Sequence, residues 1–192
     1  MHCKFYQEKQ LVKGGWQFMI IVYIGNVGYP DTASSIHVRN RGIFMKIFGH
    51  EVHVLCELAS DGKRMEEVDE LTYQYMDPYP GQGKIRGAYW NLDQVFGKFY
   101  FKQTQKYIDK IKPDVVILYE PNSILYILKM LKLSKKEGFK LVIETTEWRN
   151  PKDYRGIISR VINTEKDLQK KYIDKKVGNV IAISKYLYRT KL

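Results

Sequence analysis

The stretch MIIVYIGNVGYPDTASSIHVRNRG, residues 19–42, carries the pattern that determines the fold. It begins with a continuous apolar and β-branched run that stops at Gly25, which is typical of a strand covered on both faces of a sheet. A turn-rich loop follows, and Ser34 or Ser35 then caps a helix that we predict over residues 34–48. The pattern therefore predicts a strand that leads through a loop into a helix.

Strand and helix patterns alternate along the rest of the chain. We predict further strands at residues 51–57, 114–120, 140–146 and 179–184. We predict helices at residues 92–112, at 156–176 and from 185 onward. A further helix begins after an N-cap at Asn122 or Ser123. Residues 60–91 are rich in Asp, Gly, Pro and Tyr, which predicts a long loop with one short strand near 71–75. Alternating strands and helices form a parallel sheet with helices on both faces. The prediction is an α/β, Rossmann-like, doubly wound parallel sheet in one domain over 19–192, after an irregular lead over 1–18.

The composition is that of a globular protein rather than a disordered or membrane-spanning one. Hydrophobic residues make up 44% of the 192 residues, and charged residues make up 28%. The longest apolar run, residues 18–25, is far shorter than the roughly 20 residues that a membrane-spanning helix needs. The two cysteines, Cys3 and Cys56, form neither a disulfide framework nor a metal-binding spacing. A reducing cytoplasm fits this composition best.

A net charge of +11 predicts an anionic partner, which is a nucleic acid, a phospholipid surface or a phosphorylated small molecule. The excess lysines form three clusters. They are Lys98, Lys102, Lys106, Lys110 and Lys112; Lys129, Lys132, Lys135, Lys136 and Lys140; and Lys166, Lys170, Lys171, Lys175 and Lys176. Solvated helix faces and a membrane-facing patch explain these clusters equally well.

The loop after the first predicted strand has the physical requirements of an anion site without a known glycine motif. Gly25 and Gly28 are spaced G-x-x-G with no third glycine, and no Gly-Lys-Ser/Thr sequence is present. The small residues Ala33, Ser34 and Ser35 let a ligand approach the N-terminus of the following helix, where the dipole favours negative charge. Any strand-to-helix turn needs small and capping residues, so a purely structural role has equal weight.

Two later strands deliver carboxylates at the edge of the sheet where ligands bind. The third strand leads into YEPNS with Glu120, and the fourth leads into ETTEWRNP with Glu144, Glu147, Trp148 and Arg149. A carboxylate can bind a sugar hydroxyl, a Trp ring can cover the apolar face of a sugar, and an Arg can hold a phosphate. This mixture favours a functional role over an ordinary charged surface loop.

Two helical residues have positions that need an explanation. His37 lies on the first turn of the first helix, beside the predicted ligand site, and is a candidate binding residue. Glu165 shares an apolar helix face, where an edge position or a partner explains a carboxylate better than a catalytic role does. We predict no metal site, since no His or Cys pair at ligand spacing has a third partner.

The order of these segments resembles the N-terminal domain of family-four glycosyltransferases, which are retaining enzymes of the GT-B architecture. The matching pieces are IVYIGNVGYPDTASSIHVRNRGIFMKIFGHEVHVL, KPDVVILYEPN, KLVIETTEWRNP and NVIAISKYL, over about residues 19–192. The resemblance implies that a sugar is moved from a nucleotide-sugar to an acceptor, with no metal or other cofactor. It also implies an active site between two Rossmann-like domains, of which the N-terminal one mainly holds the acceptor.

The resemblance also implies roles for individual residues. The loop that contacts the donor phosphates corresponds to Gly28, Thr32, Ala33 and Ser34, although the paired glycines of the family are missing. Tyr119 stands where many members carry a His, and Glu120 after it is the candidate catalytic residue. The candidate acceptor-binding residues are His37, Tyr119, Glu147, Trp148 and Arg149.

The predicted function is that of the N-terminal half of a hexosyltransferase-type glycosyltransferase in cell-surface polysaccharide synthesis. Its expected partners are a nucleotide-sugar donor, a glycan or lipid-phosphate acceptor, and an anionic membrane surface on the cytoplasmic side. The donor domain is expected to be absent from residues 1–192. Either this is a truncated or split form, or a partner chain supplies the second domain, and the chain alone is expected not to be active. The alternative is a non-catalytic Rossmann-like module that binds a nucleotide or nucleic acid. Nucleic acid is the less favoured partner, because most of the 15 tyrosines lie in the predicted loop or inside helices.

Overall fold

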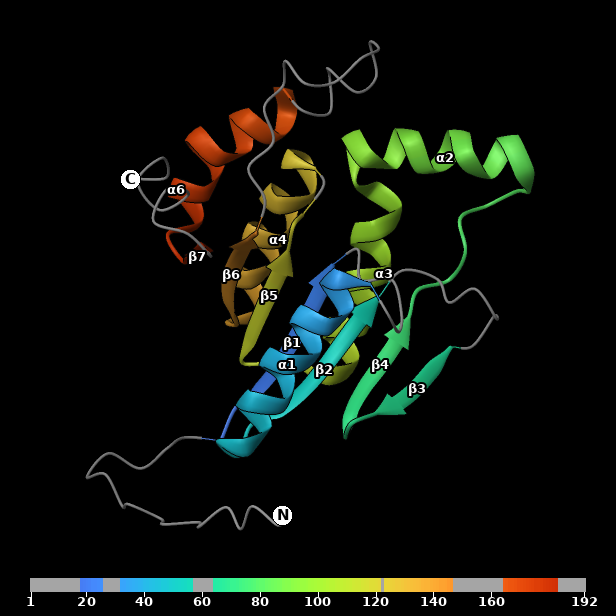
Figure 1. Ribbon diagram of the computed structural model, residues 1–192. Coiled ribbons are helices and arrows are strands. Elements are labelled where there is room, and N and C mark those ends of the chain that lie inside the picture. Colours follow the sequence, from blue (N-terminus) through green and yellow to red (C-terminus); the bar gives the residue numbers. More distant parts are fainter. Residues whose placement is uncertain (1–17, 26–31, 57–63, 122, 147–163, 183–192) are drawn as a thin grey trace.

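The computed structural model describes residues 18–25, 32–56, 64–121, 123–146 and 164–182 (Figure 1). Seven strands form one sheet in the order β3-β4-β2-β1-β5-β6-β7. The strands are β1 (Ile20–Gly25), β2 (Glu51–Cys56), β3 (Met65–Val68), β4 (Leu71–Tyr75), β5 (Val115–Tyr119), β6 (Lys140–Thr145) and β7 (Val180–Ala182). All neighbours pair in parallel except β3 and β4, which form an antiparallel pair at one edge.

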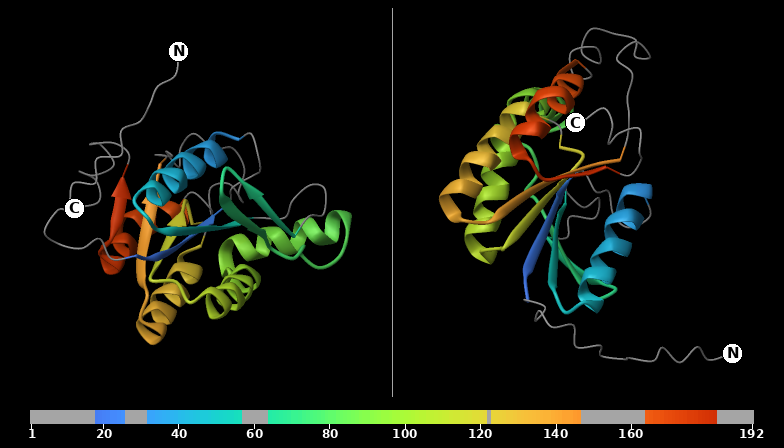
Figure 2. Two further views of the ribbon diagram at one scale, coloured as in Figure 1. Left: turned by 90° about the horizontal axis from the view of Figure 1, so that it is seen from below. Right: turned by 90° about the vertical axis from the view of Figure 1, so that its left-hand side faces the viewer.

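Helices cover both faces of this sheet, which confirms the predicted doubly wound α/β fold. They are α1 (Ala33–Ile47), α2 (Gly83–Phe96), α3 (Lys98–Ile111), α4 (Ile124–Glu137), a π-helical turn (Gln169–Ile173) and α6 (Asp174–Val177). Figure 2 shows α1 on one face and α3, α4 and α6 on the other. Within the described parts of the chain, no helix is long and apolar enough to cross a membrane.

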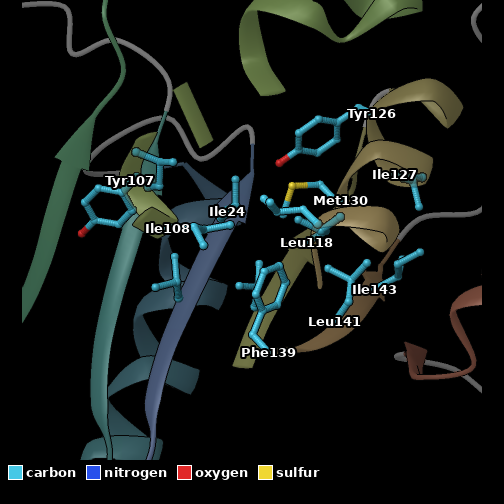
Figure 3. Packing of buried hydrophobic residues seen from close by; sticks show 14 of the residues in the cluster. Ile24, Tyr107, Ile108, Leu118, Tyr126, Ile127, Met130, Phe139, Leu141 and Ile143 are labelled. Atoms are coloured by element: carbon cyan, nitrogen blue, oxygen red, sulfur yellow. The ribbon is translucent and has the colours of Figure 1, made fainter. Parts of the chain in front are cut away.

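The core has two layers because the central strands are buried on both faces. Along β1, Ile21 and Tyr23 pack toward α1, whereas Val22 and Ile24 pack toward α3 and α4. The larger layer, drawn in Figure 3, joins β1, β5 and β6 to the apolar faces of α3 and α4. Full burial of each such aliphatic side chain contributes about 1.5–3 kcal/mol. The continuous apolar runs of the sequence are therefore explained by burial on both sides.

The predicted loop over 60–91 and the predicted single helix over 92–112 are wrong in part. The short strand near 71–75 is confirmed as β4, but β3 and most of α2 also lie in the predicted loop. The helical region then breaks at Gly97, whose φ of +54° is a left-handed conformation that glycine adopts at little cost. The start of α2 carries no capping signal, because its N-cap Gln82 makes no side-chain hydrogen bond to the helix.

Asp93 links the two helices on either side of this break. It is buried near the end of α2, and its carboxylate accepts hydrogen bonds from the backbone N–H groups of Phe99 and Tyr100, both at 2.8 Å. These two N–H groups lie in the first turn of α3, where no intrahelical acceptor is available. An α2 side chain therefore caps α3 and sets the angle between the two helices.

The other predicted helix ends agree closely with the structure. Thr32 rather than Ser34 or Ser35 is the N-cap of α1, and Ser123 caps α4 as predicted. Gly49, after the end of α1, has a φ of +86°. The predicted helix over 156–176 is confirmed over the described residues 164–176, whereas residues 156–163 and the predicted helix from 185 lie outside them.

Cys56 is buried, which raises the pKa of its thiol to about 12 and leaves it a small apolar residue.

Candidate functional site

The candidate site lies at the C-terminal ends of β1 and β5. On one side of β1 the strand order continues to β2, and on its other side it continues to β5 and β6. The order of the strands therefore reverses between β1 and β5, which form the topological switch point. Gly25 and Tyr119, the last residues of these two strands, pair directly in the parallel register. Ligands of open α/β sheets bind in the crevice outside such a pair of strand ends.

A narrow cavity is present at this point. It is lined by Gly25, Tyr79, Tyr100, Tyr119, Glu120 and Tyr126, and its volume of about 20 Å³ is room for roughly one water molecule. A wider groove of about 540 Å³ adjoins it and shares Tyr79 and Tyr100 with it. Trp90, Phe99 and Arg86 also line this groove. Most of it is built by residues 76–90, which the sequence pattern assigned to a loop, so the sequence did not predict this groove.

Gly25 allows the two strand ends to approach each other. A Cβ atom at this position would lie 2.6 Å from the backbone oxygen of Tyr119 and 2.9 Å from its Cβ. Both distances are shorter than any that carbon atoms tolerate without a shift of the neighbour. The absence of a side chain at residue 25 therefore determines the width of the switch point.

Glu120, the predicted catalytic residue, is held in a defined orientation. Its φ of +44° is left-handed, which is uncommon for a residue with a side chain and occurs often at functional sites. Its backbone N–H donates to the backbone oxygen of Glu144 at 2.9 Å. Its Oε1 accepts hydrogen bonds from the N–H of Thr146 and, at 3.1 Å, from the Thr146 hydroxyl. The carboxylate is thus anchored across the ends of β5 and β6.

Two predicted acceptor-binding residues, His37 and Tyr119, lie together. Their ring centroids are 5.6 Å apart, and the Tyr119 hydroxyl lies 3.4 Å from the Thr146 hydroxyl that also contacts Glu120. The structure therefore brings His37, Tyr119 and Glu120 to one end of the sheet. Gly28, Glu147, Trp148 and Arg149 lie outside the described residues.

The start of α1, predicted to contact donor phosphates, is a well-capped helix end. The Thr32 Oγ1 accepts from the Ser35 N–H at 3.2 Å and lies 2.9 Å from the Ser34 hydroxyl. Thr32 and Ala33 are exposed, and Ser34 is half-buried. Capping uses one of the free N–H groups of the first turn, and the exposed small residues leave the helix N-terminus open to an anion.

A buried ionic cluster lies beside this helix and was not predicted as a unit. Glu144, which is fully buried near the end of β6, accepts from His37 Nε2 at 2.7 Å and lies 3.1 Å from Arg41 Nη1, both at its Oε1. Arg41 follows His37 by four residues on the same face of α1. That spacing was visible in the sequence, but the partner Glu144 is 107 residues away from His37.

Tyr23 adds a second buried polar group to this cluster. Its hydroxyl and the Oε2 of Glu144 both lack a hydrogen bond of acceptable geometry among the described residues. Burial raises the pKa of Tyr23 well above its usual range; the nearby Glu144 carboxylate raises it further, and the Arg41 guanidinium opposes this. Tyr23 therefore stays neutral, and its hydroxyl keeps a proton that it can donate in a hydrogen bond.

Glu165 is paired, in agreement with the interpretation from its sequence position. Its Oε1 accepts from the backbone N–H of Ile124 at 2.9 Å, at the first residue of α4. Burial raises the pKa of this carboxyl, and the hydrogen bond from Ile124 opposes part of that shift. Glu165 is thus an N-terminal partner of α4 rather than a member of the candidate site.

Glu165→Gln is expected to stabilise the protein at neutral pH relative to the unmodified chain. A raised folded-state pKa means that the stability linked to Glu165 is fully present below the unfolded pKa of about 4.3. It is lost as the pH rises through the folded pKa. Gln keeps an oxygen for Ile124 and does not ionise, so the advantage of the variant should vanish near pH 4. Urea unfolding from pH 4 to 8 measures this, with Glu137→Gln as the control for charge removal. A gain that is the same at every pH would contradict the assignment.

The predicted lysine clusters come together on one face of the molecule. Helices α3 and α4 each carry four lysines and one acidic residue, and both lie on the face opposite α1 (Figure 2). Residues 164–177 lie on the same side, although Lys166 and Lys170 are buried rather than exposed. We call the exposed lysines of α3, α4 and residues 164–177 the basic face.

Comparison with known proteins identifies the fold. Neither a protein-family model nor a curated protein sequence matches this chain. A solved structure, the sucrose-phosphate synthase from Thermosynechococcus elongatus, matches with a TM-score of 0.52 and 12% sequence identity. The match covers 85% of this chain and 47% of that one, so this chain spans about half the length of the structure it matches. The likeness shows a glycosyltransferase-like, Rossmann-like fold.

Proposed function

We propose that this chain is the acceptor-side half of a glycosyltransferase that moves a sugar from a nucleotide-sugar to a glycan or lipid-linked acceptor. One observation carries the proposal: Glu120 is anchored beside Gly25 at the switch point of a glycosyltransferase-like fold, next to an aromatic groove. Family-four membership, implied by the quoted sequence segments, belongs to the same proposal. A second Rossmann-like domain, from the same protein or a partner chain, is needed to hold the nucleotide.

The site has the groups that an acceptor sugar requires. The Glu120 carboxylate can accept a hydrogen bond from a sugar hydroxyl and orient it toward the donor. Trp90, Tyr79 and Tyr100 line the adjoining groove, where aromatic rings can cover the apolar faces of sugar rings. Arg86 in the same groove can bind an acidic substituent. In this proposal the acceptor lies along the groove with its reacting hydroxyl at Glu120.

A peripheral position on the cytoplasmic face of a membrane is part of the same proposal. Helix α2 reaches outward from the rest of the molecule in Figure 1 and exposes Ile85, Leu92 and Phe96 by 62%, 57% and 53%. Lys84 and Arg86 flank Ile85 in the sequence of this helix. An exposed helix that combines apolar and basic residues can lie in the membrane interface, and the basic face adds attraction to anionic lipid. A membrane location brings the site to a lipid-linked acceptor in cell-surface polysaccharide synthesis.

Vesicle binding tests the acceptor and the membrane together. We expect sedimentation with phosphatidylcholine–phosphatidylglycerol vesicles that weakens as salt rises, and none with pure phosphatidylcholine. Adding a polyprenyl-phosphate-linked sugar should increase binding roughly tenfold for one charge-assisted hydrogen bond, and Glu120→Gln should remove that increase. Glu137→Gln, on the surface of α4, is the matched control. Equal binding with and without the lipid-linked sugar would contradict the acceptor role, and tight binding to single-stranded nucleic acid would favour the alternative module.

In a transfer assay with nucleotide-sugars, the 192-residue chain alone should show no turnover.

A further inference from the structure

The cluster of His37, Arg41 and Glu144 is a charged unit that the proposed acceptor site does not use. Glu144 is fully buried, whereas the side chains of His37 and Arg41 are 29% and 33% exposed. Both side chains project from α1 and share one carboxylate oxygen. The exposed part of the cluster therefore consists of two basic side chains.

Apolar side chains in the same place would stabilise the fold about as well as this cluster does. A buried ion pair loses its hydration, and apolar residues of similar volume usually stabilise a core at least as well. Two buried polar atoms of this cluster also lack hydrogen bonds. They are Glu144 Oε2 and the Tyr23 hydroxyl, which have no partner of good geometry among the described residues. The arrangement is better explained as one that orients His37 and Arg41.

The two oriented side chains retain donors for a ligand. His37 uses Nε2 toward Glu144, which leaves Nδ1 on the other side of the ring. Arg41 uses Nη1, and its planar guanidinium has further N–H groups that match the geometry of a phosphate. His37 also lies one turn into α1, where the helix dipole reinforces attraction of an anion.

We propose that His37 and Arg41, oriented by the buried carboxylate of Glu144, form a binding site for a phosphate group of a substrate. Glu144 is a positioning residue, and the side chains of His37 and Arg41 contact the ligand. The loop before α1 lacks the paired glycines that would let its backbone contact a phosphate, and the side chains of His37 and Arg41 supply these contacts instead. The inference rests on the proposed function only for the source of the phosphate, which is either the diphosphate of a nucleotide-sugar or the phosphate of a lipid-linked acceptor.

Nuclear magnetic resonance titration of the histidine rings tests the site directly. Inorganic pyrophosphate stands for the donor diphosphate, and a short-chain polyprenyl monophosphate stands for the acceptor. We expect saturable shifts of the His37 ring with at least one probe, and the probe that binds more tightly identifies the source. His53 is an internal control, because it also pairs with a glutamate, Glu51, at 2.7 Å, but at the opposite end of the sheet.

Matched variants separate this site from general attraction of anions to a basic protein. His37→Gln and Arg41→Gln should each weaken probe binding about tenfold, as expected for loss of one charge-assisted bond, and Arg41→Lys should weaken it less. Arg39→Gln, on another face of the same helix, removes the same charge from a residue that pairs with Asp69 and should leave affinity within about twofold. Each single variant leaves Glu144 one cationic partner, and circular dichroism verifies that it is folded.

The proposal is overturned if His37 and His53 respond equally, or if Arg39→Gln and Arg41→Gln weaken binding equally. It is also overturned if neither probe shifts His37. These outcomes leave the vesicle result with Glu120→Gln unaffected, so failure of the phosphate site and failure of the acceptor site are distinguishable.

Discussion

The double variant His37→Phe/Arg41→Met should be less stable than the unmodified protein by about 3 kcal/mol at neutral pH. Both substitutions keep apolar bulk over the sheet while removing the two polar partners of Glu144. Glu144 is fully buried and has no water-exposed surface to relax into. An unpaired carboxylate in that environment keeps its full desolvation penalty, which is why the expected loss is large.

Adding Glu144→Met to the double variant should restore most of the lost stability, because the stranded charge is then replaced by apolar volume. Urea unfolding of the single, double and triple variants at neutral pH measures both the loss and its recovery. A double variant within about 1 kcal/mol of the parent, or a triple variant no more stable than the double, would show that Glu144 does not depend on these partners.

Gly25→Ala should destabilise the protein by about 3 kcal/mol, at the upper end of the usual range for overpacking. The new methyl group would meet the backbone oxygen of Tyr119 at 2.6 Å, and backbone in the centre of a sheet cannot rotate away as a side chain can. The β1 and β5 ends must therefore separate, which also displaces Tyr119 and Glu120. Binding of the lipid-linked sugar should be lost together with stability.

Gly87→Ala is the control for this substitution. Gly87 lies inside α2, and a Cβ atom there would meet no atom within 4 Å. Ala is the better helix former by up to about 1 kcal/mol, so this variant should be as stable as the parent or more so. If Gly25→Ala unfolds at the same urea concentration as Gly87→Ala, the close approach of β1 and β5 does not limit stability.

The strands were predictable because burial on both faces leaves a local signature. The runs at 20–24, 115–119 and 141–143 are continuous and apolar, with many β-branched residues, and no other element explains such short runs as well. Helix α2 lacks any comparable signature. Its N-cap makes no side-chain bond, and its large apolar residues face solvent instead of forming one buried stripe. The groove that α2 helps to form was therefore missed with it.

The candidate site was predicted where one strand end supplies the residue and missed where distant segments meet. Glu120 follows a recognisable strand, so its place at the edge of the sheet could be inferred from the sequence. The pairing of Glu144 with His37 and Arg41 could not, because it depends on how α1 crosses the sheet from β1 and on which face of β6 the Glu144 side chain points to.

Local sequence patterns were enough to predict the alternation of strands and helices, the Rossmann-like class of the fold and the end of the sheet at which polar residues gather. These properties follow from local periodicity, since a residue's neighbours along the chain decide whether a segment can be buried on one face or two. The distance between β1 and β5 at Gly25, and the sharing of one buried carboxylate by His37 and Arg41, depend on how the elements pack in three dimensions. Such contacts join residues that are about one hundred positions apart, and their geometry depends on strand order, register and packing.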